Sequence, residues 1–176
     1  MSLSGLAQQL VTHGVLDEED AVQAVDEAQK KKTTFVNHLI DKNLVPASEI
    51  ALIASQEFGI PVLDLSSVDT ESVPKNLVSD ALIQKHHAVP LNKRGNRLYV
   101  AISDPMNLGA LDEFKFTTGT PTEAVLVEGD KLGKFIQKFL EDADTVMEDL
   151  DLDDDLDNLE VTGEEEDKGG DISESD

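Results

Sequence analysis

The sequence predicts an α+β protein in three parts: a tandem helix-pair module at residues 3–60, a small β-α-β-β-α-β-α domain at residues 61–140, and a disordered acidic tail at residues 141–176. Three observations predict this organisation. Apolar residues recur at helical spacing in two copies 29 residues apart, short β-rich runs bounded by glycine or proline follow them, and acidic residues dominate the end of the chain.

Each copy of the repeat opens with a short amphipathic segment. The matching apolar positions are Leu6, Leu10, Val11, Val15 and Leu16 in the first copy, and Phe35, Leu39, Ile40, Leu44 and Val45 in the second. The first three positions of each copy have the spacing i, i+4, i+5, which is typical of one helical face. Each segment reaches a residue that tolerates positive φ, Gly14 or Asn43, so a helix is expected to end there.

A second helix is predicted in each copy. Asp17 is a good N-cap for a helix that runs to about Lys32, and Pro46 suits the first position of a helix that Gly59 closes. A single helix pair could not bury its apolar face, whereas two stacked pairs can.

The second domain alternates short strands with amphipathic helices. Strands are expected at 61–65, 88–91, 98–102 and 124–127, with helices at 74–86, 108–116 and 130–140. Arg94-Gly95-Asn96 between two apolar runs indicates a hairpin.

Charge and composition exclude several functions. The 176 residues carry a net charge of −23, and residues 141–176 hold 18 acidic side chains against Lys168 alone. Such a polyanion repels phosphate backbones, so neither nucleic-acid binding nor direct membrane insertion is expected. No apolar run is long enough to span a membrane, and there is no cysteine, so a soluble cytoplasmic protein is expected.

No catalytic or metal-ligating arrangement stands out. None of the four histidines has another histidine at i+3 or i+4, and the chain has no cysteine. The acidic run Asp149–Glu160 has Asp154 where a calcium loop needs glycine, and Gly129–Phe135 is too short for a phosphate-binding loop. We therefore expect no catalytic residue, no metal site and no cofactor in these residues.

Two stretches carry a family resemblance: the doubled Leu-x-x-x-Leu-Val-x-x-Gly-Val-Leu pattern followed by Ser55–Pro61, and the segment Leu91–Pro105. They resemble the N-terminal domain of the secretion and pilus ATPases, most closely the type IV pilus assembly ATPases of the PilB type. The resemblance implies a parent that extends pili with ATP and Mg, using a hexameric motor domain whose Walker motifs are absent here. This segment is then not itself an enzyme.

In some members the doubled motif binds cyclic di-GMP. The motif's arginine positions are Gly5 and Thr34 here, its glycine positions Ala7 and Val36, and its closing glutamine positions Ala28 and Glu57. Loss of both arginines removes the cations that a guanine dinucleotide needs. A direct cyclic di-GMP sensor through residues 5–59 remains an alternative. It would use Gly5, Leu6, Leu10, Val11, Gly14, Val15, Leu16, Leu39, Ile40, Leu44 and Val45.

The resemblance also implies a partner. ATPases of this type dock a small PilZ-domain adaptor on the N-terminal domain, so the expected role is regulatory: to link the motor and the inner-membrane pilus platform to that adaptor, and hence to twitching motility. The candidate docking residues are Leu6, Leu10, Val11, Val15, Leu16, Phe35, Leu39 and Ile40. A structural spacer that supports hexamer assembly is the further alternative.

Overall fold

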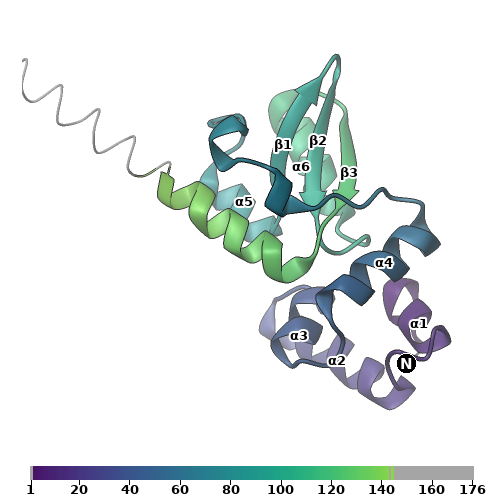
Figure 1. Ribbon diagram of the computed structural model, residues 1–176. Coiled ribbons are helices and arrows are strands. Elements are labelled where there is room, and N and C mark those ends of the chain that lie inside the picture. Colours follow the sequence, from purple (N-terminus) through teal and green to yellow (C-terminus); the bar gives the residue numbers. More distant parts are fainter. Residues whose placement is uncertain (1, 143, 145–176) are drawn as a thin grey trace, which may run out of the picture. The chain divides into compact units, whose positions relative to one another are not determined.

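The computed structural model describes residues 2–142 and 144. Contacts within the chain divide it into two units, Met1–Leu140 and Glu141–Asp176. The predicted disordered tail, apart from residues 141, 142 and 144, and the Asp149–Glu160 pattern lie outside the described residues. The first unit combines helices with a three-stranded sheet, which confirms the predicted α+β class (Figure 1).

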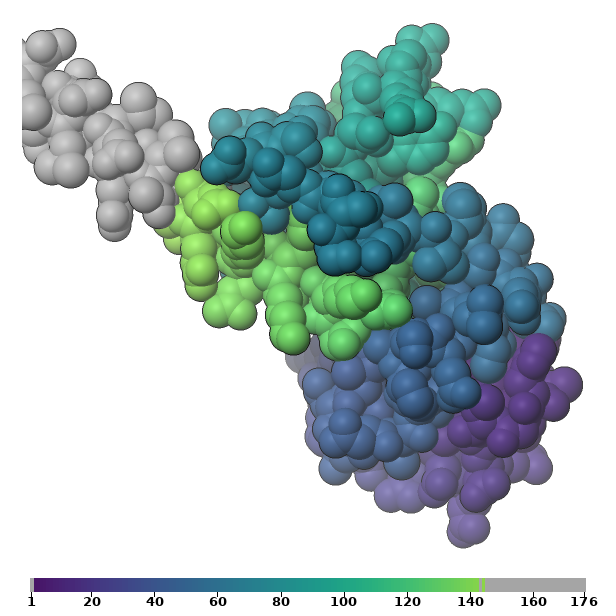
Figure 2. Space-filling view, viewed as in Figure 1, coloured from purple at the N-terminus to yellow at the C-terminus, as the bar shows by residue number. Residues whose placement is uncertain are grey.

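The helical repeat consists of four helices. They are α1 (Gly5–Thr12), α2 (Glu18–Lys31), α3 (Phe35–Asp41) and α4 (Ala47–Phe58). α1 packs on α2 and α4, and α3 packs on α2 and α4, so each copy buries its apolar face partly against the other. In the space-filling view these residues, purple to blue, occupy one continuous stretch of the visible surface (Figure 2).

The first helix of each copy ends with the same hydrogen bonds. The Val15 amide donates to the Leu10 carbonyl at 3.1 Å, and the Leu44 amide donates to the Leu39 carbonyl at 3.0 Å. These bonds require a left-handed residue in between, which is Gly14 at φ 71 or Asn43 at φ 53. The repeat found in the sequence is therefore a repeat of backbone structure.

The sheet contains β1 (Val89–Arg94), β2 (Arg97–Ile102) and β3 (Thr122–Leu126) in the order β1-β2-β3. β1 and β2 form the predicted antiparallel hairpin, with Gly95 at φ 58 in a two-residue turn. α6 (Leu108–Thr118) connects β2 to the parallel strand β3. The Thr122 hydroxyl donates to the Leu111 carbonyl of α6 at 2.9 Å, so α6 covers the face that carries Leu98, Thr122 and Leu126 (Figure 1).

The predicted strand at 61–65 is wrong in extent. Only Val62 forms a bridge, to Leu126, with the Leu63 amide donating to the Leu126 carbonyl and the Leu126 amide donating to the Pro61 carbonyl, both at 2.8 Å. The chain then turns into the short 3-10 helices η1 (Leu65–Ser67) and η2 (Thr70–Ser72). Asp64 accepts a hydrogen bond from the Ser66 amide at 3.0 Å, and this local turn outcompetes further strand pairing.

The helix predicted at 74–86 begins six residues later than expected. α5 spans Asp80–His86, and Ser79 is its N-cap, with its hydroxyl accepting from the Leu82 amide at 3.4 Å. Asn76 has φ 68, which a helix cannot contain. Pro74 therefore lies in an irregular segment rather than in the first turn of the helix.

The last helix of the first unit begins at residue 129. Its buried face carries Leu132, Phe135, Ile136 and Phe139, which join the single hydrophobic core of the unit. The Gly129–Phe135 segment forms the start of this helix, where the Lys131 amide donates to the Asp130 carboxylate and the Leu132 amide donates to the Glu128 carbonyl. Within the described part of the chain, no helix combines the length and apolar character that a membrane span needs.

Candidate docking and ligand site in the helical repeat

The candidate docking residues divide by burial. Leu6, Leu10, Leu16 and Leu39 are buried in the core. Val11, Val15, Phe35 and Ile40 are half-buried and pack against that core. The four buried leucines cannot reach a partner while the helices keep this packing, so any docking face in the repeat depends on the half-buried set.

The residues that only the cyclic di-GMP alternative includes differ widely in their exposure to solvent. Gly14 is exposed, Leu44 is 38% exposed and Val45 is buried at 2%. Gly5 is half-buried and has φ 57 at the start of α1. The apolar members of this set therefore serve mainly to build the helices.

The two positions where the ligand-binding motif has arginine cannot present a cation. A Cβ atom at Gly5 would lie 2.9 Å from the sulfur of Met106, and the positive φ at Gly5 adds strain for any side chain. Thr34 is the N-cap of α3, where its hydroxyl accepts from the Asn37 amide at 3.1 Å. One position is thus crowded, and the other side chain is committed to the backbone.

The two closing positions of the motif are committed as well. Ala28 is buried at 3% exposure on the inner face of α2. The Glu57 carboxylate lies 2.8 Å from Nε2 of His13, and this contact joins α4 of the second copy to the end of α1 in the first. None of the four polar positions of the motif therefore points a free polar group at a ligand.

A second histidine joins the copies from the inside. His38 on α3 is only 3% exposed, and its Nε2 lies 3.0 Å from Oε2 of Glu27 on α2. The pKa of Glu27 is lowered, first by the hydrogen bond from the Gln23 amide and then by the charges of Lys42 and His38. His38 therefore acts as a link within the repeat.

Asp104 joins the second copy of the repeat to the part of the unit that contains the sheet, residues 61–140, which we call the sheet half. This carboxyl follows β2, is 7% exposed, and accepts from the Met106 amide at 2.8 Å and from the Val36 amide in the first turn of α3. Burial raises the pKa of Asp104, while these two backbone bonds oppose the rise. A carboxylate suits the positive end of a helix, so Asp104 caps α3 from another part of the fold.

Ile40 packs where α3 meets the last helix, close to Gly129. A Cβ at Gly129 would lie 2.5 Å from Cδ1 of Ile40 and 3.3 Å from Cγ1 of Val36. The close approach of α3 to the last helix therefore depends on a residue without a side chain at position 129. Of the half-buried set, Val11, Val15 and Phe35 remain for a partner.

His87 lies beside this junction with a buried, unpartnered nitrogen, Nε2. Desolvation lowers the pKa of His87, while a hydrogen bond with the Gly129 backbone and the charge of Asp41 act in the opposite direction. The ring is therefore held neutral near pH 7, because the protonated form would be buried.

The sequence did not single out Asp104 and Gly129 as residues that join the second copy to the sheet half, or His38 as a residue that links the two copies. The Ser103-Asp104-Pro105 segment marked the end of a strand, and only its tertiary position shows that Asp104 caps α3. Large exposed apolar side chains were also unmarked, among them Leu52 at 56% and Phe116 at 90% exposure.

Comparison with known proteins supports this reading of the fold. The model of the MshEN domain family matches residues 58–146. The type IV pilus assembly ATPase PilB of Pseudomonas aeruginosa is 45% identical over 161 residues, which is 92% of this chain and 28% of that protein. PilB of Acinetobacter baylyi is 38% identical, with 88% of this chain and 27% of that protein covered.

Solved structures show the same fold. The N-terminal domain of XpsE matches with a TM-score of 0.62 at 19% identity, covering 79% of this chain and 99% of that one. A structure of MshE with cdg matches with a TM-score of 0.57 at 23% identity, covering 78% and 99%.

The fold and the matched residues define an MshEN domain of the kind found in the N-terminal regions of type IV pilus ATPases. The chain belongs to this family. It spans 28% of the length of the P. aeruginosa relative, and the motor domain of such ATPases is not part of the matched region.

Proposed function

We propose that this domain is a non-catalytic docking domain of a type IV pilus assembly ATPase, and that it binds a PilZ-type adaptor protein. In this role it couples a cytoplasmic motor to the inner-membrane pilus platform. The motor domain binds ATP and Mg, and its activity drives the pilus extension on which twitching motility depends. One observation carries the proposal. All four polar positions of the doubled ligand motif are crowded, buried or bonded within the fold, while its apolar framework is intact.

The half-buried residues left for the docking contact are Val11, Val15 and Phe35, because the buried leucines are unavailable and Ile40 contacts the sheet half. Aromatic side chains with one accessible side are frequent anchors of protein interfaces. Phe35 opens α3 next to its N-cap, so it is the strongest candidate anchor.

The test is a calorimetric titration of the full chain with the PilZ-domain protein of the same organism. Phe35→Ser should weaken binding at least about tenfold, the loss typical of a truncated anchor. Phe116→Ser is the matched control, because Phe116 is 90% exposed and lies outside the repeat. No binding by the unchanged chain at about 50 µM would remove the adaptor function.

A cyclic di-GMP sensor is the second candidate, since the fold matches MshE with cdg. Titration with cyclic di-GMP to about 100 µM separates the two, because guanine dinucleotide recognition needs cations that the four motif positions do not offer. We expect no saturable heat. If the titration gives a saturable heat that Gly14→Ala abolishes, the domain is a cyclic di-GMP sensor and the adaptor function is rejected.

A purely structural spacer predicts a different outcome. Removal of the docking contact would then leave every partner bound and only weaken assembly of the full ATPase. Phe35→Ser in the complete ATPase should instead lose the adaptor with assembly intact.

A further inference from the structure

The outer face of α6 carries large apolar side chains that the proposed function does not use. Phe116 is 90% exposed and Leu108 is 57% exposed. They lie eight residues apart with Asp112 halfway between them, so the three side chains follow one line along the helix. Ala110 and Phe114 are buried on the opposite side of α6. The exposed apolar residues are therefore aligned on one helix face, which makes them suited to a partner.

The charges on this face are balanced. Asp112 and Lys115 are both exposed, and the ion pairs found among the described residues include neither of them. Glu113, the third charged residue of α6, is engaged elsewhere, because it pairs with His86 and Lys85 of α5. The face therefore presents one negative and one positive side chain beside its apolar residues, in a chain whose net charge is −23.

Two glycines leave room on this face for the close approach of another helix. A Cβ atom built on either Gly109 or Gly119 would meet no other side chain within 4 Å, and both residues are exposed. Because glycine has no side chain, a bulky group from another molecule can lie directly against the backbone. Gly109 is next to Leu108, so together they offer a shallow apolar seat for an aromatic ring.

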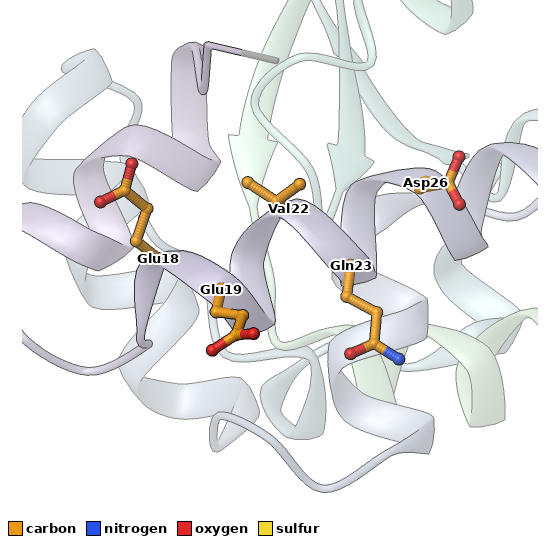
Figure 3. A pocket seen from close by; sticks show the side chains of 5 residues that line it. All are labelled: Glu18, Glu19, Val22, Gln23 and Asp26. Carbon is orange, nitrogen blue, oxygen red and sulfur yellow. The ribbon is translucent and has the colours of Figure 1, made fainter.

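An open hollow along α2 is, by contrast, a surface that cannot pair with itself. It is lined by Glu18, Glu19, Val22, Gln23 and Asp26 (Figure 3). Asp26 pairs with Lys30 at 2.7 Å, but Glu18 and Glu19 form no ion pair within the described part of the chain. Two copies that met through this hollow would place like charges opposite each other, which is unfavourable. The α6 face has no such excess of one charge, so a second copy of the same face fits it.

We propose that α6 is a weak homodimer interface, in which the α6 helices of two copies pack antiparallel about a two-fold axis near Glu113. Phe116 of each copy then lies against Leu108 and Gly109 of the other, and Lys115 of each copy faces Asp112 of the other. Every contact occurs twice, as an isologous interface requires. Each copy contributes one 11-residue helix, so the interface is smaller than the standard size and should have a Kd of about 0.1–1 mM.

The test is sedimentation equilibrium of the full chain up to about 1 mM at physiological salt, where screening limits repulsion between the acidic chains. The average mass should rise toward that of two copies and no further, because a two-fold contact closes on itself. Phe116→Ser should weaken the association at least about tenfold, since it removes the most exposed aromatic side chain of the face. Leu52→Ser is the matched control, because Leu52 is 56% exposed on α4, outside this face.

Exchange of the charges on α6 gives the sharpest outcome. Asp112→Lys and Lys115→Glu each leave two like charges on the face, so each should weaken self-association about threefold or more. A 1:1 mixture of these two variants should associate more strongly than either alone, because one chain presents two cations and the other two carboxylates. The double variant Asp112→Lys/Lys115→Glu should dimerise like the unchanged chain, because each copy again carries one charge of each sign.

Three results would overturn the proposal. The first is a chain that stays monomeric up to about 1 mM, or one whose average mass passes that of two copies. The second is association that Phe116→Ser leaves unchanged. The third is a mixture of Asp112→Lys and Lys115→Glu that associates no more strongly than the separate variants. None of these measurements involves Phe35, so the outcome for adaptor binding is independent.

Discussion

The two copies of the helical repeat end alike and begin differently. α1 and α3 share the hydrogen bonds around Gly14 and Asn43 at their C-terminal ends. At the N-terminal end of α3, the Thr34 hydroxyl accepts from Asn37 and the Asp104 carboxylate accepts from Val36. At α1, the N-cap Ser4 makes no side-chain hydrogen bond to the helix.

This difference lies in the contacts that each copy makes with the rest of the unit. The second copy is joined to the sheet half by Asp104 and by the close approach of Ile40 to Gly129. At the start of the first copy, the close neighbour is Met106, whose flexible side chain is 53% exposed. The start of the second copy is therefore hydrogen-bonded to the sheet half, whereas the start of α1 has no side-chain cap.

The largest effect tests whether the copies share one core. Leu10 and Leu39 occupy matching positions and are both fully buried at 0% exposure. Leu10→Ala and Leu39→Ala should each lower the free energy of unfolding by about 2–5 kcal/mol, because each leaves a cavity. Urea unfolding followed by circular dichroism measures both.

Leu44→Ala is the control for this pair, since Leu44 is 38% exposed and should cost much less. A first copy that unfolds in a separate, earlier transition after Leu10→Ala would contradict a single core.

The next effect tests the fastening of the second copy. Asp104→Ala leaves the Val36 and Met106 amides without their acceptor and should cost about 1–3 kcal/mol. Asp104→Asn keeps an acceptor oxygen and should cost less. Ser4→Ala, the equivalent cut at α1, should change stability by under about 0.5 kcal/mol because no cap bond is lost. Equal losses in Asp104→Ala and Ser4→Ala, measured by urea unfolding, would mean that the two N-termini do not differ.

The parts of the fold that could be predicted from sequence are those set by neighbouring residues. Gly14, Asn43 and Gly95 impose backbone conformations that hardly depend on the rest of the chain, so the repeat and the hairpin were predicted correctly. The strand at 61–65 failed because its extent depends on β3, some sixty positions away, and on the turn that Asp64 closes. The start of α5 failed because Pro74 and Ser79 are both acceptable helix beginnings, and Asn76 at φ 68 decides between them.

The candidate site was less predictable for a different reason. Leu10 and Val11 are adjacent and equally apolar, yet one is buried and the other half-buried. Periodicity identifies the apolar face of a helix but not which part of it another helix covers. The contacts of Asp104 with α3 and of Gly129 with Ile40 join residues far apart in sequence, so no local pattern could reveal them.

A pH titration tests the junction beside the second copy. The pKa of His87 is depressed below its ordinary value of 6.5, so below pH 6.5 the folded state binds fewer protons than the unfolded state. Stability should therefore fall as the pH drops below 6.5, with a slope of at most about 1.4 kcal/mol per pH unit from one proton. His87→Asn, which tolerates the left-handed backbone at φ 47, should flatten this slope.

Asp104 contributes with the opposite sign, since its raised pKa favours the folded state as the pH falls toward 3.8. The Asp104 contribution is the same in the wild-type protein and in His87→Asn, so it cancels when the pH profile of one is subtracted from that of the other. Identical pH profiles of thermal unfolding for the two proteins would contradict a buried neutral His87.

The smallest effect concerns the outer link between the copies. His13 and Glu57 are each 34% exposed, so their contact is screened by solvent and should couple by about 0–1 kcal/mol in a double-mutant cycle with His13→Gln and Glu57→Gln. The inner link, His38 with Glu27, has one partner at 3% exposure, and the same cycle with His38→Gln and Glu27→Gln should give a larger coupling. Urea unfolding at low and high salt measures both, and only the outer coupling should vanish at high salt. A larger coupling energy for His13 with Glu57 than for His38 with Glu27 would contradict this order. It would mean that the exposed ion pair contributes more to holding the two copies together than the buried one.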